Sequence, residues 1–318
     1  MQELLIHIGY HKTGTTWLQR ELFVEQSNVF SRLTNIDTKK GRLSYTFFLG
    51  NDGYILSPLD ENKEEIKKAL LEILNQKRNN NNKVLVISNE RLCGHFTTGG
   101  FDSKVIANRI NSNFPQAKIL ICVREQKSLI LSSYFQYLSK GGILNIKKYL
   151  GINIKDFRAP KFSPHHFNFN PLIKEYYSLF GKENVLVLPY EMFRITPKKF
   201  IQRIGEFVGK EIQIDDDRFK VKHNIKTNPF VLYNFRFLNV FKYSNSNNNY
   251  SSYCNRFTKF IASKIYNVIN RVVPNRLNNK VKNKLTNYIN HWVKDRYLKS
   301  NIELSKIIDI DLSKYGYH

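Results

Sequence analysis

Short apolar runs alternate with amphipathic stretches along the first two thirds of the chain. Turn-forming residues bound the apolar runs, as expected of buried strands, and the runs lie at 3–9, 83–88, 117–123 and 184–188. Apolar residues at helical spacing fill the stretches between them, at 16–25, 61–76, 103–113, 126–139, 171–180 and 197–208. This alternation predicts an α/β fold with a central, mainly parallel sheet between helices on both faces.

The last third of the chain has a different pattern. From Pro229 onward the spacing is mainly helical, and it is broken by the polar stretch 244–252 and by Pro274. No internal repeat is detectable. We therefore expect one domain over 1–318, with an α/β core at 1–228 and a mainly helical region at 229–318.

The most informative stretch joins the first predicted strand to the first predicted helix. It reads GYHKTGTT, from Gly9 to Thr16. A loop between a strand and a helix can hold an oxyanion on its backbone N–H groups and at the positive end of the helix dipole. The alternative is a purely structural turn at Gly14, with Thr15 and Thr16 capping a helix. We favour an anion-binding, P-loop-like fold.

The loop departs from the nucleoside triphosphate pattern GxxxxGK[ST] at one position. Thr15 stands where an ATPase needs lysine, and the lysine comes earlier, at Lys12. The sequence also shows no convincing acidic metal ligand on a later strand. A triphosphate-dependent kinase therefore stays an alternative. A sulfuryl group in transfer carries less negative charge than a phosphoryl group, so Lys12 and oriented amides could stabilise the bridging oxygen without a metal.

The run IGYHKTGTTWLQ resembles the 5′-phosphosulfate loop of the sulfotransferases that use 3′-phosphoadenosine-5′-phosphosulfate (PAPS). The resemblance implies metal-independent transfer of a sulfuryl group from PAPS to a hydroxyl or amine, leaving 3′-phosphoadenosine-5′-phosphate (PAP). It also implies that Lys12 is catalytic. The implied contacts to PAPS in this loop are Lys12, Thr13, Gly14, Thr15, Thr16 and Trp17.

A second anion site follows the strand that ends at Val123. Arg124 comes directly after it, and Ser132 lies eight residues later, in a predicted helix. An arginine fork with a serine hydroxyl suits a phosphate monoester. The pair resembles the family's 3′-phosphate motif, with Ser133 as an alternative to Ser132. An arginine near a helix start is otherwise a common surface feature.

The acceptor hydroxyl needs a base near the loop, at the end of a neighbouring strand. Glu90 follows the predicted strand at 83–88, and His95 is the alternative. Glu90 could instead interact with a helix dipole or pair with Arg91. We expect structural roles for His7 and His11.

The resemblance extends over nearly the whole chain and is closest to soluble bacterial, carbohydrate-type enzymes. It implies nucleotide contacts in the stretch KHNIKTNPF, at Lys222, Asn224 and Lys226. It also covers VLPYEMF and the ending IDLSKYGY. A glycan is the expected acceptor, with a lipid or a small phenol as the alternatives. At least half of a set of aromatic residues that could line its cleft are expected in the core, namely Tyr134, Phe135, Tyr137, Phe167 and Phe169.

Charge and cysteine content add limits to this picture. The net charge is +24, which suits a polyanion, but Lys, Asn and Ile are frequent throughout and favour compositional bias as its cause. A non-catalytic polyanion binder is thus a third hypothesis, and no specific nucleic-acid partner is expected. The widely spaced Cys93, Cys122 and Cys254 predict neither disulfides nor a metal. Without an 18-residue apolar run or a signal peptide, we expect a cytoplasmic protein.

Overall fold

The computed structural model describes the chain in segments. They are residues 3–24, 26–33, 83–151, 162–221, 223, 228–241 and 272–318, with isolated helical positions between 68 and 75 and between 260 and 269. The chain divides into two compact units. Unit 1 comprises Met1–Glu125, His165–His223 and Leu298–Tyr317, and unit 2 comprises Gln126–Pro164 and Asn224–Tyr297 with His318.

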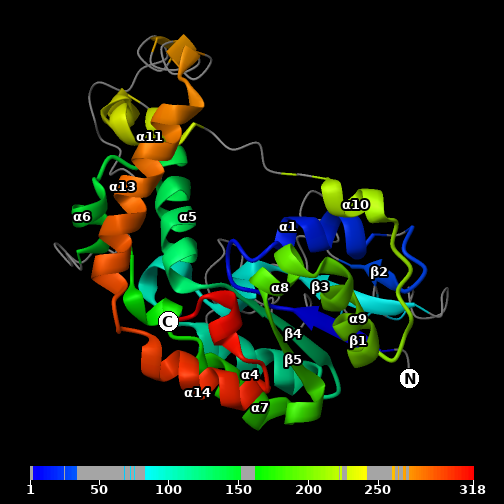
Figure 1. Cartoon of the computed structure of the whole chain (residues 1–318). Helices are drawn as coiled ribbons and strands as arrows, with labels where there is room; N and C mark the ends of the chain where they lie inside the picture. Colours follow the sequence, from blue (N-terminus) through cyan, green and yellow to red (C-terminus); the bar gives the residue numbers. More distant parts are fainter. Residues whose placement is uncertain are drawn as a thin grey trace. The chain divides into compact units, whose positions relative to one another are not determined.

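Unit 1 is built on a five-stranded parallel sheet (Figure 1). Its strands are β1 (Leu4–His7), β2 (Phe30–Arg32), β3 (Val84–Ser88), β4 (Lys118–Val123) and β5 (Val185–Pro189), in the order β2-β3-β1-β4-β5. The central strand β1 pairs with β3 on one side and with β4 on the other. Successive strands therefore switch sides at β1, and open parallel sheets bind ligands at the carboxyl ends of their strands beside such a point.

Helices cover both faces of this sheet (Figure 1). One face carries α1 (Thr15–Trp17) with a π-helical turn (Leu18–Leu22), α8 (Tyr190–Ile195) and α9 (Pro197–Phe207); the other carries α4 (Ser103–Asn113) and α7 (Asn170–Phe180). Unit 1 also contains α10 (Asp216–Lys220) and α14 (Leu298–Ile308). This arrangement confirms the predicted α/β fold with a parallel sheet between helical layers.

The alternation of side chains along the strands explains the two layers. All residues of β1, β3 and β5 are buried or nearly so, as parallel strands covered on both faces must be. Leu5, Leu120 and Leu188 point into one shared core with Trp17 and Phe200. Helix α9 packs its apolar side on the same core, because Phe200, Ile201 and Ile204 recur at helical spacing.

Unit 2 is helical. Its described helices are α5 (Gln126–Ser139), α6 (Ile146–Leu150), α11 (Pro229–Asn234) and α13 (Asn275–Val293). The long helix α13 packs against α5 and α11. The buried amide of Asn239 donates to the carbonyls of Leu138 and Gly142, at 3.0 and 2.9 Å, and so joins the 3-10 helix Arg236–Phe241 to the end of α5.

The structure corrects several predicted elements. The helix expected at 16–25 is only three residues of α-helix followed by a π-helical turn, in which the Phe23 amide reaches the Leu18 carbonyl at 2.7 Å. Strand β2 and helix α8 were not predicted, because each is too short to show a periodic pattern. The helix expected at 61–76 and the linker at 244–252 fall largely or wholly outside the described residues. Tyr134, Tyr137, Phe167 and Phe169 are buried, as expected for core aromatics.

Candidate active site at the carboxyl edge of the sheet

Parallel strands bring the predicted loop residues of unit 1 to one edge of the sheet. The segments that leave β1, β3, β4 and β5 carry Lys12, Glu90, Arg124 and Glu191. The Asn89 amide donates to the His7 carbonyl at 3.1 Å, and so holds the end of β3 against the end of β1. Residues that are 34 to 179 positions apart in the sequence therefore share one edge.

The phosphate loop is held in place by its own backbone. The amides of Ile8 and Tyr10 donate to carbonyls of β4, at 3.0 and 3.1 Å, so the loop continues the line of β1 before it turns. Lys12 and Gly14 then adopt left-handed backbone angles, with φ of 67° and 84°. The Thr13 hydroxyl donates to the Tyr10 carbonyl at 2.5 Å and closes the turn.

Gly14 is required for two separate reasons. Its positive φ disfavours any residue with a Cβ, and a Cβ at this place would lie 2.9 Å from the ring of Tyr190. The carbonyl of Gly14 accepts the amides of Trp17 and Leu18, at 2.9 and 3.1 Å, which begins α1. The tight turn into the helix therefore needs glycine at this position.

The threonines and Trp17 differ in what they can offer a ligand. Thr13 and Thr15 are buried, and the Thr15 Oγ1 atom has no hydrogen-bond partner among the described residues. A buried hydroxyl without a partner costs free energy unless a ligand satisfies it. Trp17 is buried in the core, where its Nε1–H donates to the Arg218 carbonyl at 3.0 Å and its ring stacks on Phe219.

Arg124 connects the end of β4 to the phosphate loop. Its Nη1 donates to the Lys12 carbonyl at 2.9 Å, and its guanidinium lies 5.2 Å from the centre of the Tyr190 ring. Burial lowers the pKa of this guanidinium, although neighbouring acidic groups that include Glu191 oppose the shift. Arginine remains charged in proteins, so Arg124 brings a partly buried positive charge to the loop.

Glu191 and Tyr317 form a network behind Arg124 that the sequence did not single out. The Tyr317 hydroxyl donates to Glu191 Oε2 at 3.0 Å, and the Glu125 amide donates to Glu191 Oε1 at 3.2 Å. Burial raises the pKa of Glu191. Both residues lie in segments that resemble the family, VLPYEMF and IDLSKYGY, and that resemblance was the only available signal.

Ser132 and Ser133 belong to α5 in unit 2. The Ser133 hydroxyl donates to the Leu129 carbonyl at 2.7 Å, one turn earlier in the same helix. Ser132 is half-buried. The joint action of Arg124 and Ser132 stays a prediction. Lys222, Asn224 and Lys226 lie outside the described residues.

The two candidate bases lie in the segment after β3. Glu90 begins a 3-10 helix, Glu90–Cys93, which Asn89 caps by accepting the Arg91 amide at 2.9 Å. Arg91 forms an ion pair with the fully buried Asp102. The same carboxylate accepts the His95 amide at 2.7 Å, so Asp102 fixes the whole turn, a role the sequence analysis missed.

His95 is held in a state in which its imidazole can accept a proton. Its Nδ1 lies 3.0 Å from the Thr98 hydroxyl, and burial together with the nearby Arg91 charge lowers its pKa. Lowering the pKa favours the neutral imidazole, which can accept a proton. Glu90 and His95 therefore both stay candidates on geometry.

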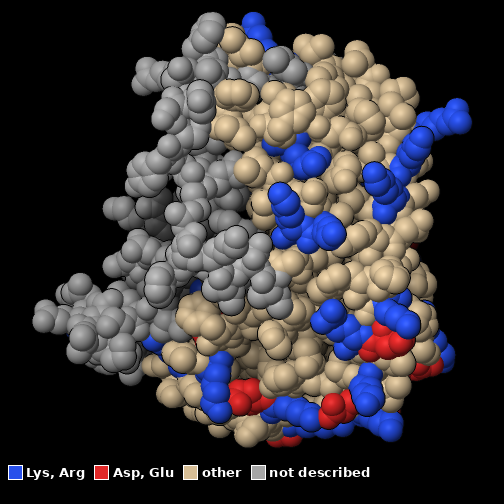
Figure 2. All heavy atoms as spheres, turned by 90° about the vertical axis from the view of Figure 1, so that its left-hand side faces the viewer, with Lys and Arg blue, Asp and Glu red and all other residues tan. Residues whose placement is uncertain are grey.

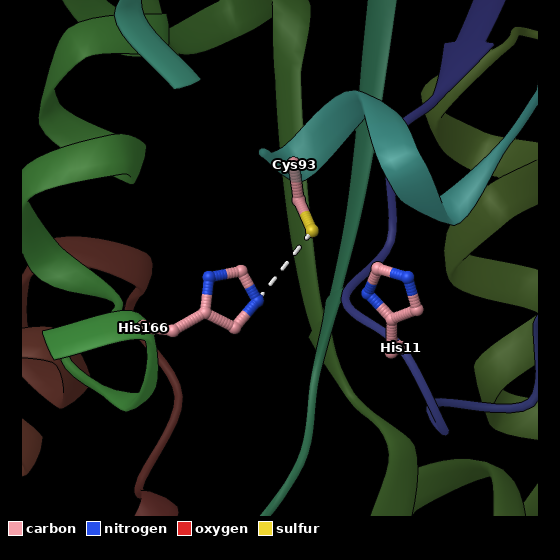
Figure 3. A group of neighbouring side chains, drawn as sticks. All are labelled: His11, Cys93 and His166. Atoms are coloured by element: carbon pink, nitrogen blue, oxygen red, sulfur yellow. Dashed lines mark hydrogen bonds between the residues drawn. The ribbon is translucent and has the colours of Figure 1, made fainter. Parts of the chain in front are cut away.

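One group of described side chains could hold a metal ion. His11, Cys93 and His166 converge in Figure 3, and one ligand atom of each lies within 4.8 Å of the others. Burial lowers the pKa of His11 to about 3 and lowers that of His166 as well. Structural zinc sites have four protein ligands and catalytic ones three, and this group of three lies among the rings of Tyr10 and Phe96. The expectation that the protein uses no metal stays a prediction.

His7 also takes a structural place. Its Nδ1 lies 2.8 Å from the Ser88 hydroxyl, which joins β1 to β3, and burial lowers its pKa to about 3. A Cβ on Gly9 would lie only 2.5 Å from His7 Nε2. The first glycine of the loop therefore gives the imidazole its space.

Comparisons with known proteins identify the family. The sulfotransferase domain model matches residues 2–296, whereas no curated protein matches the chain. Among solved structures, a sulfotransferase from Alicyclobacillus acidocaldarius is 18% identical, with 69% of this chain and 88% of that chain covered and a TM-score of 0.47. The sulfotransferase domain of the Synechococcus PCC 7002 olefin synthase is 14% identical, with 71% and 78% covered and a TM-score of 0.39.

A mouse sulfotransferase complexed with PAP is 15% identical, with 69% of this chain and 62% of that chain covered and a TM-score of 0.35. Because these TM-scores all lie below 0.5, the assignment rests on the family model, which spans most of the sequence. No helix in the described part of the chain is long and apolar enough to cross a bilayer. The chain belongs to the sulfotransferase domain family and is a PAPS-dependent sulfotransferase.

Proposed function

We propose that this enzyme transfers the sulfuryl group of PAPS to a hydroxyl or amine of a glycan acceptor, in line and without a metal ion. The observation that carries the proposal is the contact between Arg124 and the backbone of the loop that carries Lys12, at the carboxyl edge of the sheet. The Arg124 guanidinium donates to the backbone of Lys12 at 2.9 Å, so one contact joins both predicted anion sites. Chain 1–318 would act as a single sulfotransferase domain.

Lys12 would act on the leaving group. Its left-handed backbone, with φ of 67°, lies in a loop braced by the Thr13 hydroxyl, so the position of the side chain's attachment is fixed. As the bond from sulfur to the bridging phosphate oxygen breaks, negative charge grows on that oxygen. A preorganised ammonium stabilises such charge without reorganisation during the reaction.

The loop would hold the 5′-phosphosulfate. The buried Thr15 hydroxyl has no protein partner among the described residues, and a sulfate or phosphate oxygen would supply one. Gly14 and Thr16 would let backbone amides approach the same group, as loops before helices do for anions. The contact predicted for Trp17 has the least support, because its ring is packed in the core and its amide already donates to the Gly14 carbonyl.

Arg124 and Ser132 would bind the 3′-phosphate. A guanidinium can make two parallel hydrogen bonds to a phosphate, which lysine cannot. Lys222, Asn224 and Lys226 would add contacts to the nucleotide from the later segment. These roles make PAP, which retains the 3′-phosphate, the expected product ligand.

Glu90 would take the acceptor's proton, with His95 as the alternative base. The acceptor oxygen forms a bond to sulfur while the bond from sulfur to the phosphate oxygen breaks, the proton passes to Glu90, and PAP leaves. General-base catalysis of this kind contributes roughly 10²- to 10⁴-fold to rate. We place the reaction in the cytoplasm, where PAPS is made.

The test is sulfuryl transfer from labelled PAPS to a panel of saccharides, with and without a chelator. We expect the chelator to have no effect and Lys12→Ala to lower kcat by about 10²-fold or more. The control is Lys210→Ala, an exposed lysine beyond α9. Full turnover by Lys12→Ala would contradict the role of Lys12. Glu90→Gln and His95→Gln then decide the base, because only loss of the base removes the rise of rate with pH.

A further inference from the structure

Charge is distributed very unevenly between the two units. Unit 2 contains 20 of the 50 Lys and Arg residues but only two of the 26 Asp and Glu residues, Asp156 and Asp295. Its formal charge is therefore +18 of the total +24, and unit 1 carries the remaining +6. Residues 224–294 contain no acidic residue at all.

Compositional bias does not explain this separation. A bias toward Lys and Asn acts on the whole chain, yet unit 1 balances its 30 basic residues with 24 acidic ones. The loss of acidic residues is confined to unit 2. Segregated charge of one sign marks a surface that meets a partner of the opposite sign.

The basic residues lie on a solvent-facing surface. Helix α13 buries Val281, Leu285 and Ile289 against its neighbours in unit 2, so its opposite side faces the solvent. That side exposes Arg276, Lys280 and Lys284. Figure 2 shows the side of the molecule on which α6 and α13 lie, and Lys and Arg are spread over its upper part with no Asp or Glu visible among them.

Apolar side chains are exposed within the same acid-free segment. The described positions between 260 and 272 are helical, and four-residue steps place successive residues on one side of a helix. Phe260, Val268 and Val272 follow these steps and are 57%, 62% and 71% exposed. Lys264 lies between them, with its ammonium 4.6 Å above the Phe260 ring.

We infer that unit 2 docks on an anionic phospholipid surface, with the apolar side chains of Phe260, Val268 and Val272 entering the headgroup region and Lys264 and the exposed Lys and Arg residues of α13 meeting lipid phosphates. Exposed aliphatic and aromatic residues on a helix without acidic residues are the pattern of helices that lie in a membrane interface. A nucleic acid or an acidic polysaccharide would match the charge but would give Val268 and Val272 no partner. The inference does not depend on the sulfuryl-transfer proposal.

The test is sedimentation of the full chain with lipid vesicles. The vesicles contain phosphatidylcholine alone, or with about a quarter of phosphatidylglycerol, which supplies the negative surface charge. We expect binding to the anionic vesicles at least about tenfold tighter than to the neutral ones, and weaker in high salt because the charges are screened. Equal binding to both vesicles, or binding to neither, would overturn the inference.

Matched double variants separate docking from general loss of apolar surface. Phe260→Asp with Val268→Asp removes two exposed residues of unit 2, whereas Phe101→Asp with Ile195→Asp removes two equally exposed residues of unit 1, at 62% and 64%. We expect the first pair to weaken vesicle binding about tenfold or more and the second pair to change it less than about twofold. Equal losses from both pairs contradict the inference, as does tight binding to heparin or DNA without vesicle binding. Circular dichroism checks folding.

Discussion

Single backbone positions determine the shape of the phosphate loop. Gly14 combines a left-handed φ of 84° with a close approach to Tyr190, and Lys12 bears a left-handed φ although it has a side chain. Non-glycine residues in this region cost about 1 to 3 kcal/mol each and persist at functional sites because the surrounding structure holds them. The strain at Lys12 is consistent with selection for the direction of its side chain.

Gly14→Ala should therefore destabilise the protein for two reasons, the strain of a positive φ on alanine and the clash of its Cβ with the Tyr190 ring. The control is Gly209→Ala, since Gly209 has a φ of 61° and would place its Cβ in open space. We expect the Gly209 variant to lose about 1 kcal/mol of unfolding free energy and the Gly14 variant to lose about 2 kcal/mol or more. Urea unfolding measures both, and equal losses would show that Tyr190 imposes no steric limit on the loop.

At the scale of elements, short connections at the ends of β4 and β5 support the site. Glu191 lies in the first turn of α8, just after β5. It accepts hydrogen bonds from the Glu125 amide and the Tyr317 hydroxyl, which joins the ends of β4 and β5 to the C-terminal segment near Arg124. These two hydrogen bonds favour the charged form of the Glu191 carboxylate, which opposes the effect of its burial. The Glu191 carboxylate influences the Arg124 charge electrostatically. We therefore predict that Glu191 and Tyr317 position Arg124 rather than bind the ligand themselves.

Tyr317→Phe should weaken PAP binding through Arg124. Loss of the hydroxyl removes a hydrogen bond worth about 0.5 to 1.5 kcal/mol, and its absence raises the pKa of Glu191 further. We expect the Kd for PAP to rise about three- to tenfold, and more steeply as the pH falls. The control is Tyr315→Phe, in the 3-10 helix Leu312–Tyr315 that comes just before Tyr317. A Kd unchanged at every pH would mean that the network does not position Arg124.

The elements that the sequence predicted well are those with a strong local pattern. Strands β1, β3, β4 and β5 are continuous apolar runs, and the carboxyl ends of these strands place Lys12, Glu90 and Arg124 at one edge, as expected. Strand β2 has three residues and no periodic signal. Asp102 could not be found from the sequence, because an isolated acidic residue has no distinctive pattern. Glu191 stood out only by its place in a segment that resembles the family, since its partners Glu125 and Tyr317 are distant along the chain.

The whole molecule contains several buried imidazoles whose neutral form the fold requires. Burial lowers the pKa of His7 and of His11 to about 3, and it lowers that of His166 too. In the unfolded chain their pKa is about 6.5. Unfolding therefore takes up protons once the pH falls below 6.5, and stability declines with it.

This linkage predicts a pH dependence whose upper part, between pH 7.5 and 5.5, lies above the ordinary pKa values of carboxylates. The contribution of these residues to stability is complete above about pH 7 and is lost progressively as the pH falls from 6.5 toward 3. Between pH 7.5 and 5.5 each imidazole should cost about 1.4 kcal/mol of unfolding free energy. Urea unfolding of the wild type and of His166→Gln measures this. The same decline in both proteins, or no decline in either, would contradict the role of His166.

Calorimetric titration of PAP into the metal-free protein tests whether Lys12 and Arg124 form one PAP-binding edge. The proteins are the wild type, Arg124→Ala and the control Arg203→Ala on α9, and ATP with Mg²⁺ is the competing ligand. We expect tight PAP binding by the wild type and the control, and a Kd at least about tenfold higher for Arg124→Ala, since a lost arginine–phosphate pair costs about 1.5 to 3 kcal/mol. Equal PAP binding by all three proteins, or tighter binding of ATP with Mg²⁺ than of PAP, would contradict this prediction.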